Sequence, residues 1–194
     1  MTIYYHGSDQ MDLNIIKPKI STHGKKYVYA TKYKNLALIF LSRWNDFLLT
    51  LGTNIIKNNL KITLVERHKN IIKDVFQNKN GTIYTLESDN FKQIPDMWEF
   101  EYISEKEEIP IKMEIIENIL DKINELKFVN EIEIYYYPNR PQNIPENDYD
   151  MVEKTIELYK HSKDINNVIY CIKKFPQLKG EIVKIFNKEF EINL

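Results

Sequence analysis

Ile3-Tyr4-Tyr5-His6-Gly7-Ser8, close to the N-terminus, is a β-branched and aromatic run that ends in a histidine, a glycine and a hydroxyl. This composition predicts a strand over residues 2–5, which His-Gly-Ser ends. Two later segments, residues 26–31 and 98–104, have the composition of strands that can meet it. They would bring a tyrosine and a glutamate to the histidine from distant parts of the chain. We predict that the three segments line one cleft.

The overall composition describes an ordinary folded protein. Of the 194 residues, 43% are hydrophobic and 28% charged, and the formal net charge is −1. These values suit one domain, or one domain with a helical appendage. The near-zero charge gives no general electrostatic reason to bind nucleic acid or an anionic membrane. Cys171 is the only cysteine, which excludes an internal disulfide and a multi-cysteine zinc site.

Targeting and metal signals are weak in this sequence. The first residues lack the basic and then apolar pattern of a signal peptide, and no run of about 18 apolar residues is present. We therefore expect a cytoplasmic protein without a membrane contact. His23, His68 and His161 have no metal-ligand spacing, so we expect no metal site.

Hydrophobic periodicity predicts an α+β arrangement for the first two-thirds of the chain and helices for the last third. Tyr27 and Tyr29 should share one face of their strand, because side chains alternate with a period of two. The expected strands are 2–5, 27–30, 60–65, 82–86, 99–104 and 109–116, with 132–136 either a strand or a buried helix end; the expected helices are 35–51 and 118–128, and residues 21–25 are an expected turn.

The segment 138–145 holds three prolines and two asparagines and is the expected boundary. We predict an α+β domain over residues 1–137 and a helical C-terminal extension over residues 146–194. The extension should hold three helices: one capped by Asn147 or Asp148 and ending near His161, one from Asp164 to Phe175, and one from Pro176 to about Phe190.

Three motifs follow one another in a recognisable order. They are Tyr5-His6-Gly7-Ser8, then Tyr29-Ala30-Thr31 with Phe40 in the following helix, then Glu101-Tyr102-Ile103-Ser104. The set resembles the ADP-ribosyltransferase fold, in the His-Tyr-Glu branch of poly- and mono-ADP-ribosyl polymerases. The resemblance covers residues 2–116 and implies split antiparallel sheets with helices.

The resemblance implies transfer of ADP-ribose from NAD, as substrate, to a protein or nucleic-acid acceptor, with release of nicotinamide. Glu101 would be the catalytic carboxylate, accepting a hydrogen bond from the ribose 2′-hydroxyl while positive charge develops on the ribose ring. Glu99, two residues earlier, would lie on the same face of a strand and is the rival for this role.

The same resemblance assigns the NAD-binding residues. His6 would bind the adenosine ribose, and Gly7 would offer its main-chain N–H and C=O to the nicotinamide amide. Tyr29 and Phe40 would enclose the nicotinamide ring, with Tyr27 as an alternative to Tyr29. Ser8 would either form a hydrogen bond within the cleft or cap the turn.

Two positions depart from the pattern of the branch. The serine that binds the carboxamide is missing, since Ala37 or its neighbours stand in its place, and the second aromatic residue is Phe40 instead of tyrosine. These departures motivate an alternative function, a non-catalytic module that binds ADP-ribose or a related nucleotide. A third alternative is an interaction protein whose helical extension carries the function.

Overall fold

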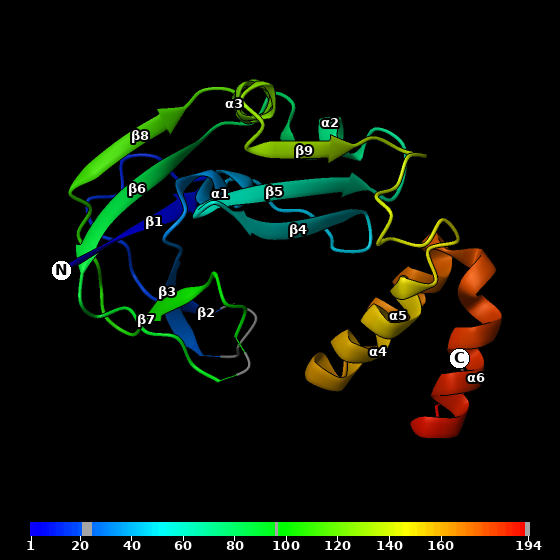
Figure 1. Ribbon diagram of the computed structural model, residues 1–194. Helices are drawn as coiled ribbons and strands as arrows, with labels where there is room; N and C mark the ends of the chain where they lie inside the picture. The colour runs from blue at the N-terminus through cyan, green and yellow to red at the C-terminus, as the bar shows by residue number, and fades with distance from the viewer. Residues whose placement is uncertain (21–24, 96, 193–194) are drawn as a thin grey trace.

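The structure is a computed structural model that describes residues 1–20, 25–95 and 97–192. These residues form an α+β fold (Figure 1). The strands are β1 (Thr2–Ser8), β2 (Lys19–Ile20), β3 (Lys26–Ala30), β4 (Leu49–Ile56), β5 (Asn59–Glu66), β6 (Gly81–Ser88), β7 (Tyr102–Ser104), β8 (Lys112–Ile116) and β9 (Ile132–Tyr135). The helices are α1 (Lys34–Ile39), α2 (Ile71–Phe76), α3 (Ile119–Phe128), α4 (Asp150–Ser162), α5 (Ile165–Lys174) and α6 (Lys179–Glu189), with a 3₁₀ turn, η1 (Pro176–Leu178), before α6.

The described strands form three small sheets, in the orders β1-β6-β8, β2-β3-β7 and β4-β5-β9. Pairing is antiparallel throughout the first two sheets, and in the third β5 pairs antiparallel with β4 and parallel with β9. A single bridge between Tyr5 and Thr31 joins β1 to the end of β3. The predicted α+β class is therefore confirmed.

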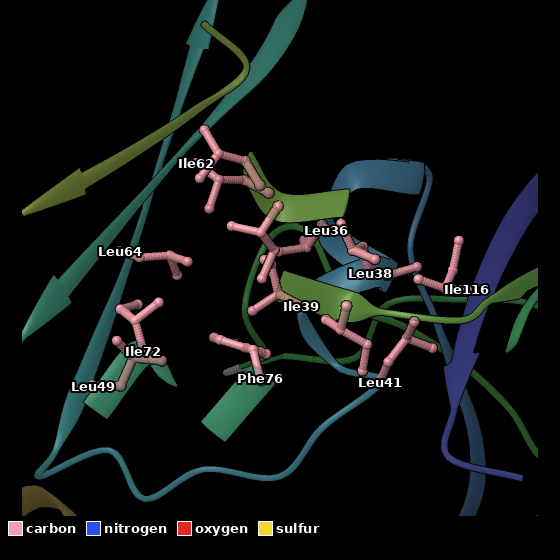
Figure 2. Close-up of a cluster of buried hydrophobic side chains, with 14 of the residues drawn as sticks. Leu36, Leu38, Ile39, Leu41, Leu49, Ile62, Leu64, Ile72, Phe76 and Ile116 are labelled. Carbon is pink, nitrogen blue, oxygen red and sulfur yellow. The ribbon is translucent and has the colours of Figure 1, made fainter. Parts of the chain in front are cut away.

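The largest hydrophobic cluster lies between α1, α2, α3 and the β4-β5-β9 sheet. Figure 2 shows its side chains converging from these elements, which are distant in sequence. The helix α1 is buried from Leu36 to Ile39 and packs against both β1 and the third sheet. Members of this cluster include Leu36, Leu38, Ile39, Leu41, Leu49, Ile62, Leu64, Ile72, Phe76 and Ile116.

The C-terminal helices surround a second apolar cluster, into which Phe47 inserts from the segment before β4. The helix α5 begins as predicted, because the Asp164 carboxylate accepts the N–H of Asn166 at 2.9 Å. A buried arginine, Arg67 at the end of β5, donates to Asp148 at 2.9 Å and to Asp150 at 2.5 Å. These hydrogen bonds link the start of α4 to the end of β5 in the β4-β5-β9 sheet.

The prediction of a helix over residues 35–51 is wrong about where the helix ends. The helix α1 ends at Ile39 with Phe40 as its C-cap, and β4, which the sequence did not reveal, begins at Leu49. The side chain of Asn45 accepts the N–H of Phe47 at 2.8 Å, a local turn that competes with helix. Phe47 therefore lies in a different hydrophobic cluster from Leu36.

Several further predictions are corrected. The strand β1 continues through His6 and Gly7 to Ser8, so these residues do not end it, and the strand expected over residues 109–116 begins only at Lys112. The strand expected over residues 99–104 begins only at Tyr102, because the N–H of Glu101 bonds to the carbonyl of Trp98 at 2.9 Å and closes a turn. The helix α4 has Tyr149 at its N-cap and no side-chain cap, since Asp148 accepts from Arg67 instead. Residues 21–24 of the turn predicted at 21–25, together with His23, lie outside the described residues.

Candidate functional site

The two strands β1 and β3 meet and then separate. Tyr5 and Thr31 exchange both main-chain hydrogen bonds, at 2.7 and 2.9 Å, but this is an isolated bridge that does not continue to Gly7 and Tyr29. At that point the Nδ1 atom of His6 lies 2.6 Å from the Tyr29 carbonyl oxygen. The imidazole therefore occupies the place where strand pairing stops, and it links the first predicted motif to the second.

The environment of His6 sets its protonation. Burial lowers its pKa below the ordinary value of 6.5, the nearby Lys19 lowers it further, and the hydrogen bond to Tyr29 opposes both. The ring is thus neutral at pH 7. Because a carbonyl can only accept, we assign the ring proton to Nδ1, which leaves Nε2 as an acceptor.

The main chain of Gly7 faces the gap between the strands. Tyr5 directs its N–H and C=O toward β3, so Gly7, two residues further along the same strand, directs its own pair to the same side. On the helix side, a Cβ atom at Gly7 would lie 2.2 Å from the carbonyl oxygen of Ala37. Glycine is therefore required by the close approach of α1, and its amide group is directed toward the gap.

A cavity of about 370 Å³ opens at this gap. Its volume is in the range of small-molecule sites. It is lined by the middle of β1, the end of β3, one side of α1 and the turn before β7. The lining residues are Tyr5, His6, Gly7, Tyr29, Ala30, Thr31, Leu36, Ala37, Phe40, Trp98, Phe100 and Glu101.

The cavity distinguishes the two candidate glutamates. Glu101 is half-buried and lines it, whereas Glu99 is exposed and does not. The expectation that both lie on one strand face is wrong, because the turn at residues 98–101 replaces that part of the strand. Three aromatic rings line the same cavity as Glu101: Trp98 and Phe100 lie edge-to-face at 5.3 Å, and Phe40 lies 6.4 Å from Trp98.

The cavity also distinguishes the two candidate tyrosines. Tyr29 lines it, whereas Tyr27 is buried deeper along β3. Their rings meet edge-on at 6.0 Å and both line a neighbouring cavity, so the predicted common face is confirmed. Phe40, which is 47% exposed, stands at the rim of both cavities.

The neighbouring cavity, of about 490 Å³, shares His6, Gly7, Tyr29 and Phe40 with the first. The two cavities therefore adjoin at the imidazole and at Gly7. Ser8 lines only this second cavity, and its hydroxyl accepts the N–H of Gln10 at 3.1 Å, as in the turn-capping alternative.

Three basic residues line the second cavity, and none was singled out from the sequence as a site residue; they are Lys17, Lys19 and Arg43. Lys19 lies on β2 and Arg43 follows α1, and both face the cavity that adjoins the histidine. No local motif marks any of the three. For Trp98 the sequence does hold a signal. Trp98, Phe100 and Tyr102 alternate with Glu99 and Glu101, a pattern that indicates apolar surroundings for a carboxylate.

Comparison of the chain with models of protein families, with curated proteins and with solved structures finds no match. Within residues 1–20, 25–95 and 97–192, no three His, Cys, Asp or Glu side chains are grouped so that they could hold a metal ion. Among the described helices, none has the length and apolar character needed to cross a membrane.

Proposed function

We propose that the protein transfers ADP-ribose from NAD to a protein or nucleic-acid acceptor and releases nicotinamide. The observation that carries this proposal is the convergence of His6, Tyr29 and Glu101, from three distant segments, on one cavity of about 370 Å³. For binding and cleavage of NAD, the resembled branch uses a histidine acceptor, aromatic rings and a carboxylate in partly apolar surroundings. The cavity holds all three kinds.

The nicotinamide end of NAD suits the gap between β1 and β3. A primary carboxamide has one acceptor and a pair of donor hydrogens, and the N–H and C=O of Gly7 complement it. Tyr29 and Phe40, which line the same cavity, would pack against the flat pyridinium ring. This arrangement needs no side chain at position 7, in agreement with the close approach of α1.

The remainder of NAD would extend into the second cavity. The free Nε2 atom of His6 would accept a hydrogen bond from a hydroxyl of the adenosine ribose. Lys19 and Arg43 supply positive charge on the path of the diphosphate, which carries two negative charges. A dinucleotide, whose anionic diphosphate lies between two nucleosides, is therefore the ligand that we propose for the two adjoining cavities.

The chemistry is substitution at the C1′ atom of the ribose next to nicotinamide. The C1′–N bond breaks, its electron pair leaves with neutral nicotinamide, and positive charge spreads over the ribose ring. Glu101 would accept a hydrogen bond from the 2′-hydroxyl and stabilise this charge, most strongly beside the low-dielectric rings of Trp98 and Phe100. A nucleophile of the acceptor then bonds to C1′ and loses its proton to the solvent or to the carboxylate.

Nicotinamide release from labelled NAD tests this proposal. Glu101→Gln keeps the size of the side chain but removes its charge, and we expect turnover to fall by about 100-fold or more. Glu99→Gln is the matched control, because Glu99 is exposed outside the cavity, and it should keep wild-type turnover. Equal loss in both variants, or no turnover in the wild type, would contradict the enzymatic proposal.

Ala37 favours a second candidate function, a non-catalytic module that binds ADP-ribose or a related nucleotide. Ala37, which lines the cavity, or one of its neighbours stands where the resembled branch has a serine hydroxyl. Calorimetry with ADP-ribose and NAD separates the two functions. Tight binding without nicotinamide release would support the binding module, whereas turnover by the wild type would eliminate it.

A further inference from the structure

The edge strand β8 and the segment just before it carry a row of exposed aliphatic side chains. In the described part of the chain β8 pairs only with β6, and Figure 1 shows it on the outside of its sheet. The exposed fractions are 70% for Ile109, 59% for Ile111, 46% for Met113 and 56% for Ile115. Neighbouring apolar side chains on an open strand edge are typical of an interaction surface.

The main chain of β8 is also directed outward at two of these positions, Met113 and Ile115, whereas the N–H of Ile111 donates to the Thr85 carbonyl on β6. Thr85 is paired with Tyr5, whose main-chain groups bond to Thr31, so Thr85 directs its own main-chain groups toward β8. Its carbonyl oxygen accepts the N–H of Ile111 at 2.9 Å. Lys112 is paired with Thr85, so the next residue, Met113, turns its N–H and C=O away from β6. The same alternation turns those of Ile115 outward. The edge therefore offers hydrogen-bonding groups beside apolar side chains.

We propose that two copies of this chain associate by antiparallel pairing of their β8 edges, centred on Met113. The segment Ile111-Lys112-Met113-Glu114-Ile115 is complementary to itself in this register. Each Met113 faces the other, each Ile111 faces Ile115 of the second copy, and each Lys112 faces Glu114. A two-fold axis makes every contact occur twice, as in closed dimers. The two β1-β6-β8 sheets then form one continuous sheet.

Charge selects this register among the alternatives. Lys112 and Glu114 of the second copy would form a non-hydrogen-bonded pair, because their main-chain groups bond to β6 of their own copy. Side chains lie closest together in this type of antiparallel pair. A register centred on Glu114 would instead oppose the two Glu114 carboxylates. Lys34 of α1 already forms an ion pair with Glu114 within one copy, so the carboxylate would be held between two cations.

Sedimentation equilibrium of the full chain tests the proposal through a charge reversal. We expect the wild type to form a dimer, and Lys112→Glu or Glu114→Lys to weaken dimerisation roughly tenfold or more, because each creates two like-charge contacts. The double variant Lys112→Glu/Glu114→Lys restores opposite charges across the interface and should regain part of the lost association, because Glu114→Lys still loses the ion pair with Lys34. Glu87→Lys, an exposed change on β6 away from the edge, is the control and should dimerise normally.

Three results would overturn the proposal. One is a wild-type chain that sediments as a monomer, which would leave an extended peptide of another protein as the occupant to seek. The second is normal dimerisation of both single variants. The third is a double variant that associates no better than the single ones. Circular dichroism of each variant verifies that a lost dimer is not a lost fold.

Discussion

At the residue scale, the site depends on Gly7 and His6, two neighbours with different constraints. The glycine allows the carbonyl of Ala37 to approach β1, and the histidine binds the carbonyl of Tyr29. The sequence indicated both residues, because the His-Gly-Ser motif is local. It did not indicate their partners, since the contact of Gly7 with Ala37 spans 30 residues and depends on how α1 packs.

Gly7→Ala should destabilise the fold by about 2 kcal/mol, because the new methyl group must displace the main chain of α1. Gly52→Ala is the matched control. Its Cβ would lie at an ordinary 3.5 Å from Thr63, and alanine in a strand interior is expected to be neutral or mildly stabilising. Urea unfolding of both variants measures the difference. Similar stabilities would show that α1 does not press on Gly7.

His6 should make stability depend on pH in one direction. Burial lowers its folded-state pKa below 6.5, so the unfolded chain binds the proton more readily. The contribution is present above the unfolded value and is lost as the pH falls through the folded pKa. Between about pH 7.5 and about pH 5.5, the wild type should lose more unfolding free energy than His6→Asn. His68, whose pKa burial also lowers, contributes equally to both proteins. Parallel pH profiles would contradict this.

At the scale of elements, hydrophobic spacing located most strands and helices but misjudged some of their ends. The strand at 82–86 and the helix at 118–128 were predicted because each has a periodic pattern with a turn or cap residue in front of it. The prediction of one helix over residues 35–51 was wrong, because a buried helix and a buried strand follow one another there and their apolar residues together have helix-like spacing. The turn at Asn45 separates them, and a single asparagine was too weak a signal.

The cap of α5 gives a test at this scale. Asp164→Ala removes the acceptor of the Asn166 N–H and should destabilise the protein by about 1 kcal/mol. Asp164→Asn should be nearly neutral, because an asparagine oxygen accepts the same hydrogen bond. Thermal unfolding of the two variants decides the matter. An equal loss in both would assign the effect to the charge of Asp164 and not to capping.

At the scale of the whole molecule, the helices and the α+β part share structure that local patterns could not reveal. Phe47 lies in the helical cluster although it precedes β4, and Asp148 binds Arg67 instead of capping α4. Both depend on contacts between distant residues, which a search for caps and periodicity does not detect. The boundaries at residues 137 and 146 stay a prediction, because these contacts cross them.

Arg67→Ala should therefore destabilise the whole protein by about 3 kcal/mol, since it leaves the buried Asp148 without its main partner. Lys122→Ala is the control, because it removes only an exposed pair with Glu125 and should change stability by less than about 0.5 kcal/mol. Chemical denaturation monitored by tryptophan fluorescence and by circular dichroism gives both values. A loss confined to the helical signal would show that the two parts unfold separately.

The central claim is that the gap between β1 and β3 receives the nicotinamide end of NAD. A crystal structure of the Glu101→Gln variant with NAD tests it most directly, because slow turnover would preserve the intact dinucleotide. We expect the carboxamide on the main chain of Gly7, the ring against Tyr29 and Phe40, and an adenosine ribose hydroxyl on His6. Nicotinamide bound elsewhere, or an empty cavity at saturating NAD, would contradict it.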